Sequence, residues 1–228
     1  MKSALAFAAA LISTPVAACE IELILAMDVS RSVMNAEYDL QMEGLANAFR
    51  DDVVLDLIES AGGIMATVTQ WSGVGDQAQT VPWLWLESRA STLSFADEIT
   101  NQRRSYFGAY TATGNALMHA AAISATNPTN CTRKVIDVSG DGRGNRGIDP
   151  KTASNQLVAQ GYTINALAIL GAKPSPLDFY AREVIGGPGA FVEAADGFNA
   201  YAEAIQRKIL RELSPAFVML NETTRAIE

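Results

Sequence analysis

Side-chain oxygen atoms occur together in three short segments of the chain. The segment "DVSRS" supplies Asp28, Ser30 and Ser32 at alternate positions, "YTATG" supplies Thr111, and "SGDG" supplies Asp141. None of these five residues is a histidine or a cysteine. Hydroxyl and carboxylate oxygens with few charges suit a hard divalent cation that keeps some of its water, Mg²⁺ or Mn²⁺ rather than Zn²⁺. The five residues therefore predict a metal site.

The elements around these segments would bring them to one edge of a sheet. Apolar runs predict strands at 20–27, 64–71, 79–87, 134–139, 162–170 and 190–195. Helical patterns lie at 35–50 with further turns to 59, 91–102, 113–125, 150–160, 176–185 and 199–213. This alternation predicts an α/β fold with a doubly wound, mostly parallel sheet and helices on both faces. Pro82 cannot donate to a strand ladder, so its strand belongs at an edge, where we expect it to run antiparallel.

The predicted sheet explains why the oxygens follow strands. "DVSRS" comes directly after the first strand, and "SGDG" ends the strand 134–139 that we expect beside it. In sheets of this kind, sites lie at the carboxyl ends of the strands, where the strand order switches direction. The sequence thus places the oxygens of the three segments at this edge.

The same residues resemble a known metal site. "DVSRS" resembles the Asp-x-Ser-x-Ser signature of the von Willebrand factor type A domain, whose metal-ion-dependent adhesion site also uses a threonine and a distal aspartate. Thr111 and Asp141 match those two positions, and the order and spacing agree over nearly the whole chain beyond residue 18. The resemblance implies a Rossmann-like fold in which Ser30, Ser32 and Thr111 contact the metal. It also implies that Asp28 and Asp141 hold the metal mostly through waters.

The wider sequence is similar to a bacterial exported family catalogued as domain of unknown function 1194. The similar stretches include "EYDLQMEGLANAF", "VIDVSGDG" and "VIGGPGAFV". Two departures from the type A pattern stand out: Gly140-Asp141-Gly142 replaces Thr-Asp-Gly, and Ala109-Tyr110-Thr111 replaces Gly-Gly-Thr. Neither change removes a metal-binding oxygen, but Tyr110 is positioned to narrow the approach to the metal.

The first 18 residues have the pattern of a secretory signal peptide. A basic start at Lys2, an apolar run over 4–12 and small residues before Cys19 are typical of such a leader, and the run is too short to span a bilayer. We expect a type A-like domain at 19–213 and a C-terminal tail at 214–228. We expect no transmembrane segment, and a periplasmic or secreted location.

The two cysteines are expected to form a disulfide. Cys19 and Cys131 each precede an apolar strand and lie nine and ten residues before Asp28 and Asp141. If these strands are parallel neighbours, both cysteines lie at one end of the sheet, close enough to bond. The alternative, that "VAAC" marks Cys19 for lipid attachment, leaves Cys131 unpaired.

Other signals in the sequence are weaker. The chain carries 17 Lys and Arg against 25 Asp and Glu, a net charge of −8, which argues against nucleic acid as a partner. "GRGNRG" at 142–147 fits a dinucleotide fingerprint but does not open a helix, so we interpret it as a loop at the rim of the site. His119 is the only histidine, and no Gly-x-Ser-x-Gly motif accompanies it. Asp137, inside an apolar strand, is expected to accept hydrogen bonds from a neighbouring loop or from the helix that follows.

Two functions from different classes fit these residues. The first is a non-enzymatic binding protein whose Mg²⁺ or Mn²⁺ captures a protein partner through a carboxylate. The second is a metal-dependent hydrolase in which the ion activates water, but the sequence offers no general acid or base for it. We therefore assign no catalytic residue and expect the binding protein.

Overall fold

The computed structural model describes residues 19–108 and 110–214 and contains one six-stranded sheet. The strand order is β3-β2-β1-β4-β5-β6, in which β3 pairs antiparallel with β2 and every other neighbouring pair is parallel. The strands are β1 (Cys19–Asp28), β2 (Ile64–Trp71), β3 (Gln77–Leu86), β4 (Cys131–Gly140), β5 (Tyr162–Ile169) and β6 (Val192–Ala195). The expected signal peptide and all but the first residue of the expected tail lie outside the described residues. The predicted sheet, with its single antiparallel edge strand, is confirmed.

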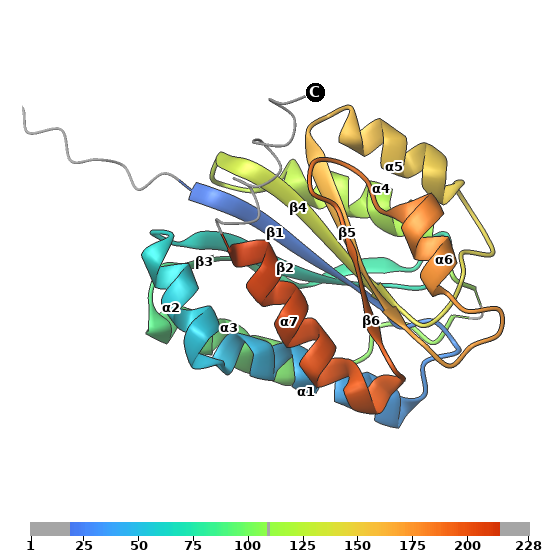
Figure 1. Cartoon of the computed structure of the whole chain (residues 1–228), viewed down its shortest axis with the longest axis horizontal. Coiled ribbons are helices and arrows are strands. Elements are labelled where there is room, and N and C mark those ends of the chain that lie inside the picture. The colour runs from blue at the N-terminus through green and yellow to red at the C-terminus, as the bar shows by residue number, and fades with distance from the viewer. Residues whose placement is uncertain (1–18, 109, 215–228) are drawn as a thin grey trace, which may run out of the picture.

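Helices cover both faces of the sheet, as predicted (Figure 1). One face carries α1, α2, α3 and α7, and the other carries α4, α5 and α6 with its π-helical continuation. The helices are α1 (Asn35–Arg50), α2 (Asp52–Ser60), α3 (Arg89–Thr100), α4 (Thr113–Ser124), α5 (Pro150–Val158), α6 (Leu177–Phe179) with the π-helical turn Tyr180–Val184, and α7 (Tyr201–Leu213), which a 3₁₀ turn at Phe198–Ala200 precedes.

Strand β1 lies in the middle of the sheet and is buried on both faces. Leu23 and Leu25 pack into the core under α1 and α7, whereas Ile24 and Ala26 pack into the core under α4 and α5. A strand covered on both sides needs an almost continuous apolar sequence, which is why its run of hydrophobic residues ends only at Asp28. The polar residues that follow Asp28 therefore emerge at the carboxyl edge of the sheet.

The edge strand β3 shows how Pro82 is accommodated. Its register with β2 shifts between the pairs Ala66–Leu84 and Val68–Val81, so Pro82 lies at an irregularity in the ladder. This is one of the few positions in a sheet where a missing backbone N–H is tolerated. β3 also begins two residues earlier than predicted, because Gln77 still pairs with Trp71 of β2.

Two helix starts differ from the prediction. The helical turns after α1 form a separate helix, because Asp51 ends α1 and its side chain accepts hydrogen bonds from Val53 N and Val54 N. Helix α3 begins at Arg89 rather than at residue 91. Its cap is Ser88, whose Oγ accepts from Ser91 N while Ser91 Oγ accepts from Ser88 N.

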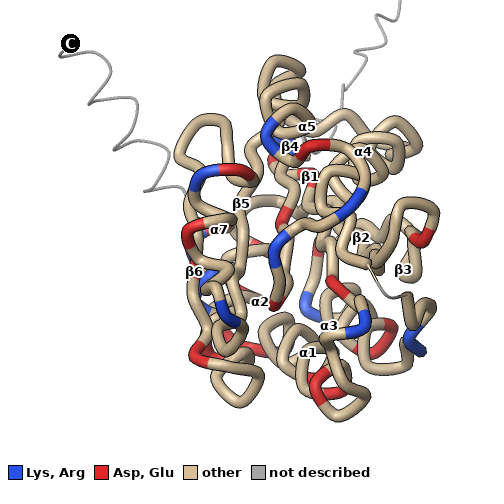
Figure 2. The backbone as a smooth tube through the Cα atoms, turned by 90° about the vertical axis from the view of Figure 1, so that its right-hand side faces the viewer, with Lys and Arg blue, Asp and Glu red and all other residues tan. Residues whose placement is uncertain are grey.

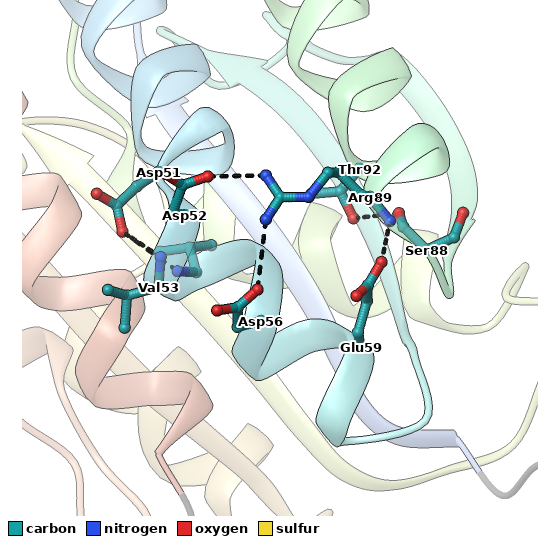
Figure 3. Close-up of polar contacts among 9 residues, drawn as sticks. Asp51, Asp52, Val53, Asp56, Glu59, Ser88, Arg89 and Thr92 are labelled. Carbon is teal, nitrogen blue, oxygen red and sulfur yellow. Dashed lines mark hydrogen bonds and ion pairs between the residues drawn. The ribbon is translucent and has the colours of Figure 1, made fainter.

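Arg89, at the start of α3, joins this helix to α2. Its guanidinium contacts Asp52 Oδ1 at 2.8 Å and Asp56 Oδ1 at 3.4 Å, and its backbone N–H donates to Glu59 (Figure 3). Arg89 is thus an exposed arginine whose charge is matched by acidic neighbours.

A buried ionic cluster joins β4 to α7. Lys208 Nζ lies 2.6 Å from Asp137 Oδ1 and 2.7 Å from Glu212 Oε1, and all three side chains are at most 2% exposed. Asn165 Nδ2 of β5 donates to the same Glu212 oxygen at 2.8 Å. The expectation that Asp137 would accept from a neighbouring loop or from the following helix is therefore wrong, because its partner comes from the last helix, 71 positions along the chain.

The two cysteines form a disulfide at the amino end of β1. Cys19 and Cys131 are paired directly across β1 and β4 in the parallel register, with their Cα atoms 4.4 Å apart. Non-reducing mass spectrometry of the protein, purified without reductant, should therefore find one species in which a disulfide links these two residues. Cys131→Ser is the matched control and should abolish that species. Two free thiols, or an acylated Cys19, would contradict the assignment.

Candidate functional site

The five predicted site residues come from four places in the fold and meet at the carboxyl edge of the sheet. Asp28 is the last residue of β1, and Ser30 and Ser32 lie in the turn that leads to α1. Thr111 precedes α4, and Asp141 directly follows β4. β1 has β2 on one side and β4 on the other, so the site lies where the strand order switches direction.

Hydrogen bonds link these side chains into one cluster. Ser30 N donates to Asp28 Oδ1 at 2.7 Å, and Ser32 Oγ donates to Asp141 Oδ1 at 2.8 Å. The hydroxyls of Ser30 and Ser32 lie 3.2 Å apart, and Thr111 Oγ1 donates to Ser30 Oγ at 3.3 Å. The structure thus brings together all five residues that the sequence singled out.

The two carboxyl groups are poorly stabilised as anions by the protein alone. Burial raises the pKa of Asp28 to about 7, and the nearby Asp141 adds to this rise. Burial also raises the pKa of Asp141, although the hydrogen bond from Ser32 opposes the change. Asp28 Oδ2 is buried and has no hydrogen-bond partner among the described residues. A cation bound here would lower both pKa values and satisfy this oxygen.

The donor set fits a hard cation. It consists of two carboxylates and three hydroxyls, and nitrogen and sulfur ligands are missing from it. The described residues contain no group of three or more His, Cys, Asp or Glu that could hold a metal ion. A metal at this site would therefore depend on serine and threonine oxygens and on water, which Mg²⁺ and Mn²⁺ tolerate better than Zn²⁺ does.

Arg104 holds the "DVSRS" turn in place and was not found from the sequence. Its Nη2 donates to Val29 O and to Ser30 O, both at 2.8 Å, and its Nε donates to Tyr106 O at 2.9 Å. These bonds fix the backbone that presents the Ser30 hydroxyl. No local pattern identifies Arg104, because it lies more than 70 positions away in an irregular segment.

Asn145 holds the backbone of Thr111 in place, as Arg104 does for the "DVSRS" turn. Its Oδ1 accepts from Thr111 N at 3.0 Å, and its own backbone N–H donates to Thr111 O at 2.9 Å. Asn145 belongs to the loop 142–147 that we predicted at the rim of the site. The loop therefore orients a predicted metal ligand in addition to forming the rim.

The side chain of Tyr180 lies beside Asp28 and Gly140, on the buried side of the site. It is fully buried, its hydroxyl lacks a hydrogen-bond partner among the described residues, and a side chain on Gly140 would collide with this hydroxyl and with Asp28. Burial, together with Asp28 and Asp141, raises the pKa of Tyr180 well above its usual value, so the phenol stays protonated. The glycine that replaces threonine before Asp141 is thus required by the close approach of Tyr180.

Other residues that the sequence drew attention to lie outside this cluster. Tyr110 is 48% exposed, and its ring stacks against the guanidinium of Arg146 at 4.8 Å. His119 is half-buried within α4, and burial lowers its pKa.

Comparison with known proteins gives one family and several similar structures. A family model described as "Protein of unknown function (DUF1194)" matches residues 18–217. A comparison with curated proteins gives no match.

Several solved structures share this fold at low sequence identity. Proximal thread matrix protein 1 from the mussel byssus has 16% identity and a TM-score of 0.65, over 85% of this chain and 48% of that chain. A second structure of it, with a zinc occupied MIDAS motif, has a TM-score of 0.63. The von Willebrand factor type A protein from Catenulispora acidiphila has 16% identity and a TM-score of 0.60, over 86% of this chain and 43% of that one.

The vWF domain of the type V pili tip protein Mfa5 from Porphyromonas gingivalis also shares the fold. It has 10% identity and a TM-score of 0.60, over 87% of this chain and 98% of that chain. This chain thus spans about half the length of the mussel protein and nearly all of the Mfa5 domain. The predicted type A fold is confirmed.

Proposed function

The chain belongs to the family described as protein of unknown function DUF1194, and from its site we propose that it is an exported, non-enzymatic binding protein with a metal-ion-dependent adhesion site. Asp28, Ser30, Ser32, Thr111 and Asp141 would hold Mg²⁺ or Mn²⁺. The observation that carries this proposal is the hydrogen-bonded cluster of these five residues, in which one buried oxygen of Asp28 has no hydrogen-bond partner in the described part of the chain.

The bound cation would supply an attachment point for a carboxylate of a protein partner. Two carboxylates of the chain leave a divalent ion with few anionic ligands, so a further carboxylate from outside is favourable. Similar structures with this fold include a pilus tip domain and a byssus matrix protein, which agrees with a role in attachment.

The disulfide also supports export. The Cys19–Cys131 disulfide is typical of an oxidising compartment such as the periplasm or the cell exterior. In the described part of the chain, no helix has both the length and the apolar character needed to cross a membrane.

Removal of a hydroxyl ligand tests the function. Ser30→Ala and Thr111→Ala should each weaken capture of a partner from the native envelope to about the extent that EDTA does, because partner affinity is linked to metal occupancy. Partner binding should in turn tighten metal binding by the same factor, since this coupling is reciprocal. Capture with Mg²⁺ and with EDTA, quantified by mass spectrometry, measures the first effect, and calorimetry measures the second.

Ser124→Ala is the matched control. Ser124 is also buried and lies near the end of α4 that is remote from the site, so its loss should leave capture unchanged. Mg²⁺-dependent turnover of phosphoesters or peptides that disappears in Ser30→Ala would overturn the proposal in favour of a hydrolase.

A further inference from the structure

We propose that the face around the metal site binds an acidic protein segment, in which the metal-binding carboxylate is flanked by further carboxylates and by an apolar side chain. The inference rests on the proposed function and specifies its partner. Its basis is the exposed apolar and cationic side chains on the loops that surround the five site residues.

Exposed apolar side chains gather at this edge of the sheet. Met34, Val74, Phe107, Tyr110 and Ile148 are between 40% and 68% exposed. They lie in the loops that follow β1, β2 and β4 and in the segment that precedes α4. Among the described residues only three other large apolar side chains are comparably exposed, and all three lie within helices. Clustered exposure of this kind is typical of an interaction surface.

Contacts between these loops join them into one surface. The Arg104 guanidinium lies 4.7 Å from the centre of the Phe107 ring and also donates to Asn35 Oδ1, next to Met34. Val74 O accepts from Asn115 Nδ2, and Asn115 Oδ1 accepts from Ile148 N. The apolar side chains are therefore held by neighbouring loops that also hold the site residues.

Three arginines on this face form no ion pair with any acidic side chain that the structure describes. Arg31, Arg143 and Arg146 are exposed, and none of them has an ion pair within 4.0 Å among the described residues. Two exposed arginines on helices α3 and α7 are paired instead: Arg89 contacts two aspartates and Arg207 contacts Glu193. The end of the sheet seen in Figure 2 carries basic residues on several of its loops. These positive charges stand out on a chain whose net charge is −8.

Two of the acidic side chains on this edge, which also carries Asp76 in the loop of Val74, are already engaged by the backbone. Glu37 accepts from Met34 N at 2.6 Å, and Asp149 accepts from Thr152 N at 2.8 Å, so each satisfies the first turn of a helix. Arg146 is instead stacked on the Tyr110 ring, which leaves the edges of its guanidinium free to donate to a carboxylate. Charge complementarity therefore favours an acidic partner that also buries an apolar side chain against Tyr110 or Phe107.

A random peptide library displayed on phage, selected on the full chain with Mg²⁺ and eluted with EDTA, identifies the preferred segment. Eluted peptides should carry two or more Asp or Glu and at least one aromatic or aliphatic residue beside them. Enrichment of neutral or basic peptides, or of none, would overturn the inference. EDTA-eluted peptides with a single carboxylate and no preferred neighbours would overturn it too, while leaving the proposed function intact.

The selected peptide, made synthetically, then serves as the probe for variants. Arg146→Gln and Arg143→Gln should each weaken its binding about three- to tenfold, with a shallower dependence on salt. Arg89→Gln is the matched control, because this exposed arginine lies away from the site and pairs with Asp52 and Asp56, and it should bind like the wild type. Wild-type affinity in both test variants would overturn the inference. Mg²⁺ affinity without peptide, measured on the same proteins, reports on the metal site separately.

Two other occupants are distinguished by the same variants. Binding to mixed phosphatidylglycerol and phosphatidylcholine vesicles that Arg146→Gln abolishes would overturn the inference in favour of a membrane surface. Self-association in sedimentation that Arg146→Gln abolishes would overturn it in favour of a second copy of the chain.

Discussion

Asp28→Asn should abolish binding of Mg²⁺ and Mn²⁺ and should make the metal-free protein more stable at neutral pH. Asparagine keeps the oxygen that accepts from Ser30 N but removes the negative charge. We expect metal affinity to fall by roughly 100-fold or more, measured by calorimetry. Asp141→Ala should lower the metal affinity to a similar extent, because it removes the second carboxylate.

The gain in stability follows from the raised pKa of Asp28. Ionisation of a fully buried carboxyl whose pKa rises from 3.8 to about 7 costs the folded state on the order of 2–4 kcal/mol at neutral pH. Between these two values the folded protein holds a proton that the unfolded chain has lost, so this carboxyl lowers stability as the pH rises through that window. Asparagine does not ionise, so Asp28→Asn removes this pH-dependent loss of stability.

Urea unfolding in EDTA tests the stability part of this prediction, and calorimetry tests the loss of metal binding. Asp28→Asn should exceed the wild type in stability at neutral pH and should approach it at about pH 3, below both pKa values, where Asp28 is mostly protonated in the folded and the unfolded state. Asp39→Asn, an exposed aspartate in α1, is the control and should change neither metal affinity nor stability. Unaltered metal affinity in Asp28→Asn would mean that the five oxygens do not form a metal site.

Lys208→Met should destabilise the fold by about 3–5 kcal/mol, because it leaves Asp137 and Glu212 buried without their cation. Burial already raises the pKa of Asp137, and Glu212 adds to the rise while Lys208 opposes it. Without Lys208 the variant should regain stability as the pH falls, since protonation then removes the charge. Urea unfolding at several pH values measures the effect.

A second change isolates the electrostatic part of this loss. Asp137→Asn in the Lys208→Met background should recover part of the stability, because one uncompensated carboxylate is removed. Lys151→Met, which replaces a lysine that has no ion pair among the described residues, is the control and should stay near the wild type. Equal stability of Lys208→Met and the wild type would show that the cluster contributes nothing to the fold.

The sequence predicted those parts of the fold whose causes are local. The apolar runs of β1 and β2 end at Asp28 and Trp71, and the amphipathic pattern of α1 covers Asn35–Arg50. The position of the five site residues could be predicted because they lie next to the ends of β1 and β4 or the start of α4. The direction of each of these elements determines the edge of the sheet at which the neighbouring residues lie. The two-residue error at the start of α3 has a local cause too, since Ser88 and Ser91 are both serines that can cap a helix.

The residues that the sequence did not predict act over long distances in the chain. Arg104 reaches back to Val29 and Ser30, and Lys208 reaches back to Asp137. Neither lies in a motif, and an arginine in a loop or a lysine in a helix is ordinarily exposed. Only the packing of α7 on the sheet identifies the partner of Asp137.

The arrangement of β1 and β4 has a mechanical consequence. The two strands are joined by the disulfide at one end and carry Asp28 and Asp141 at the other. A pulling force that enters at Asp28 and leaves at Cys19 would run along β1, parallel to both of its neighbours. It would load the hydrogen bonds between the strands in shear, all at once, instead of opening them one after another. The tension is thus shared across the middle of the sheet, and the covalent link at the far end keeps β1 and β4 from sliding apart.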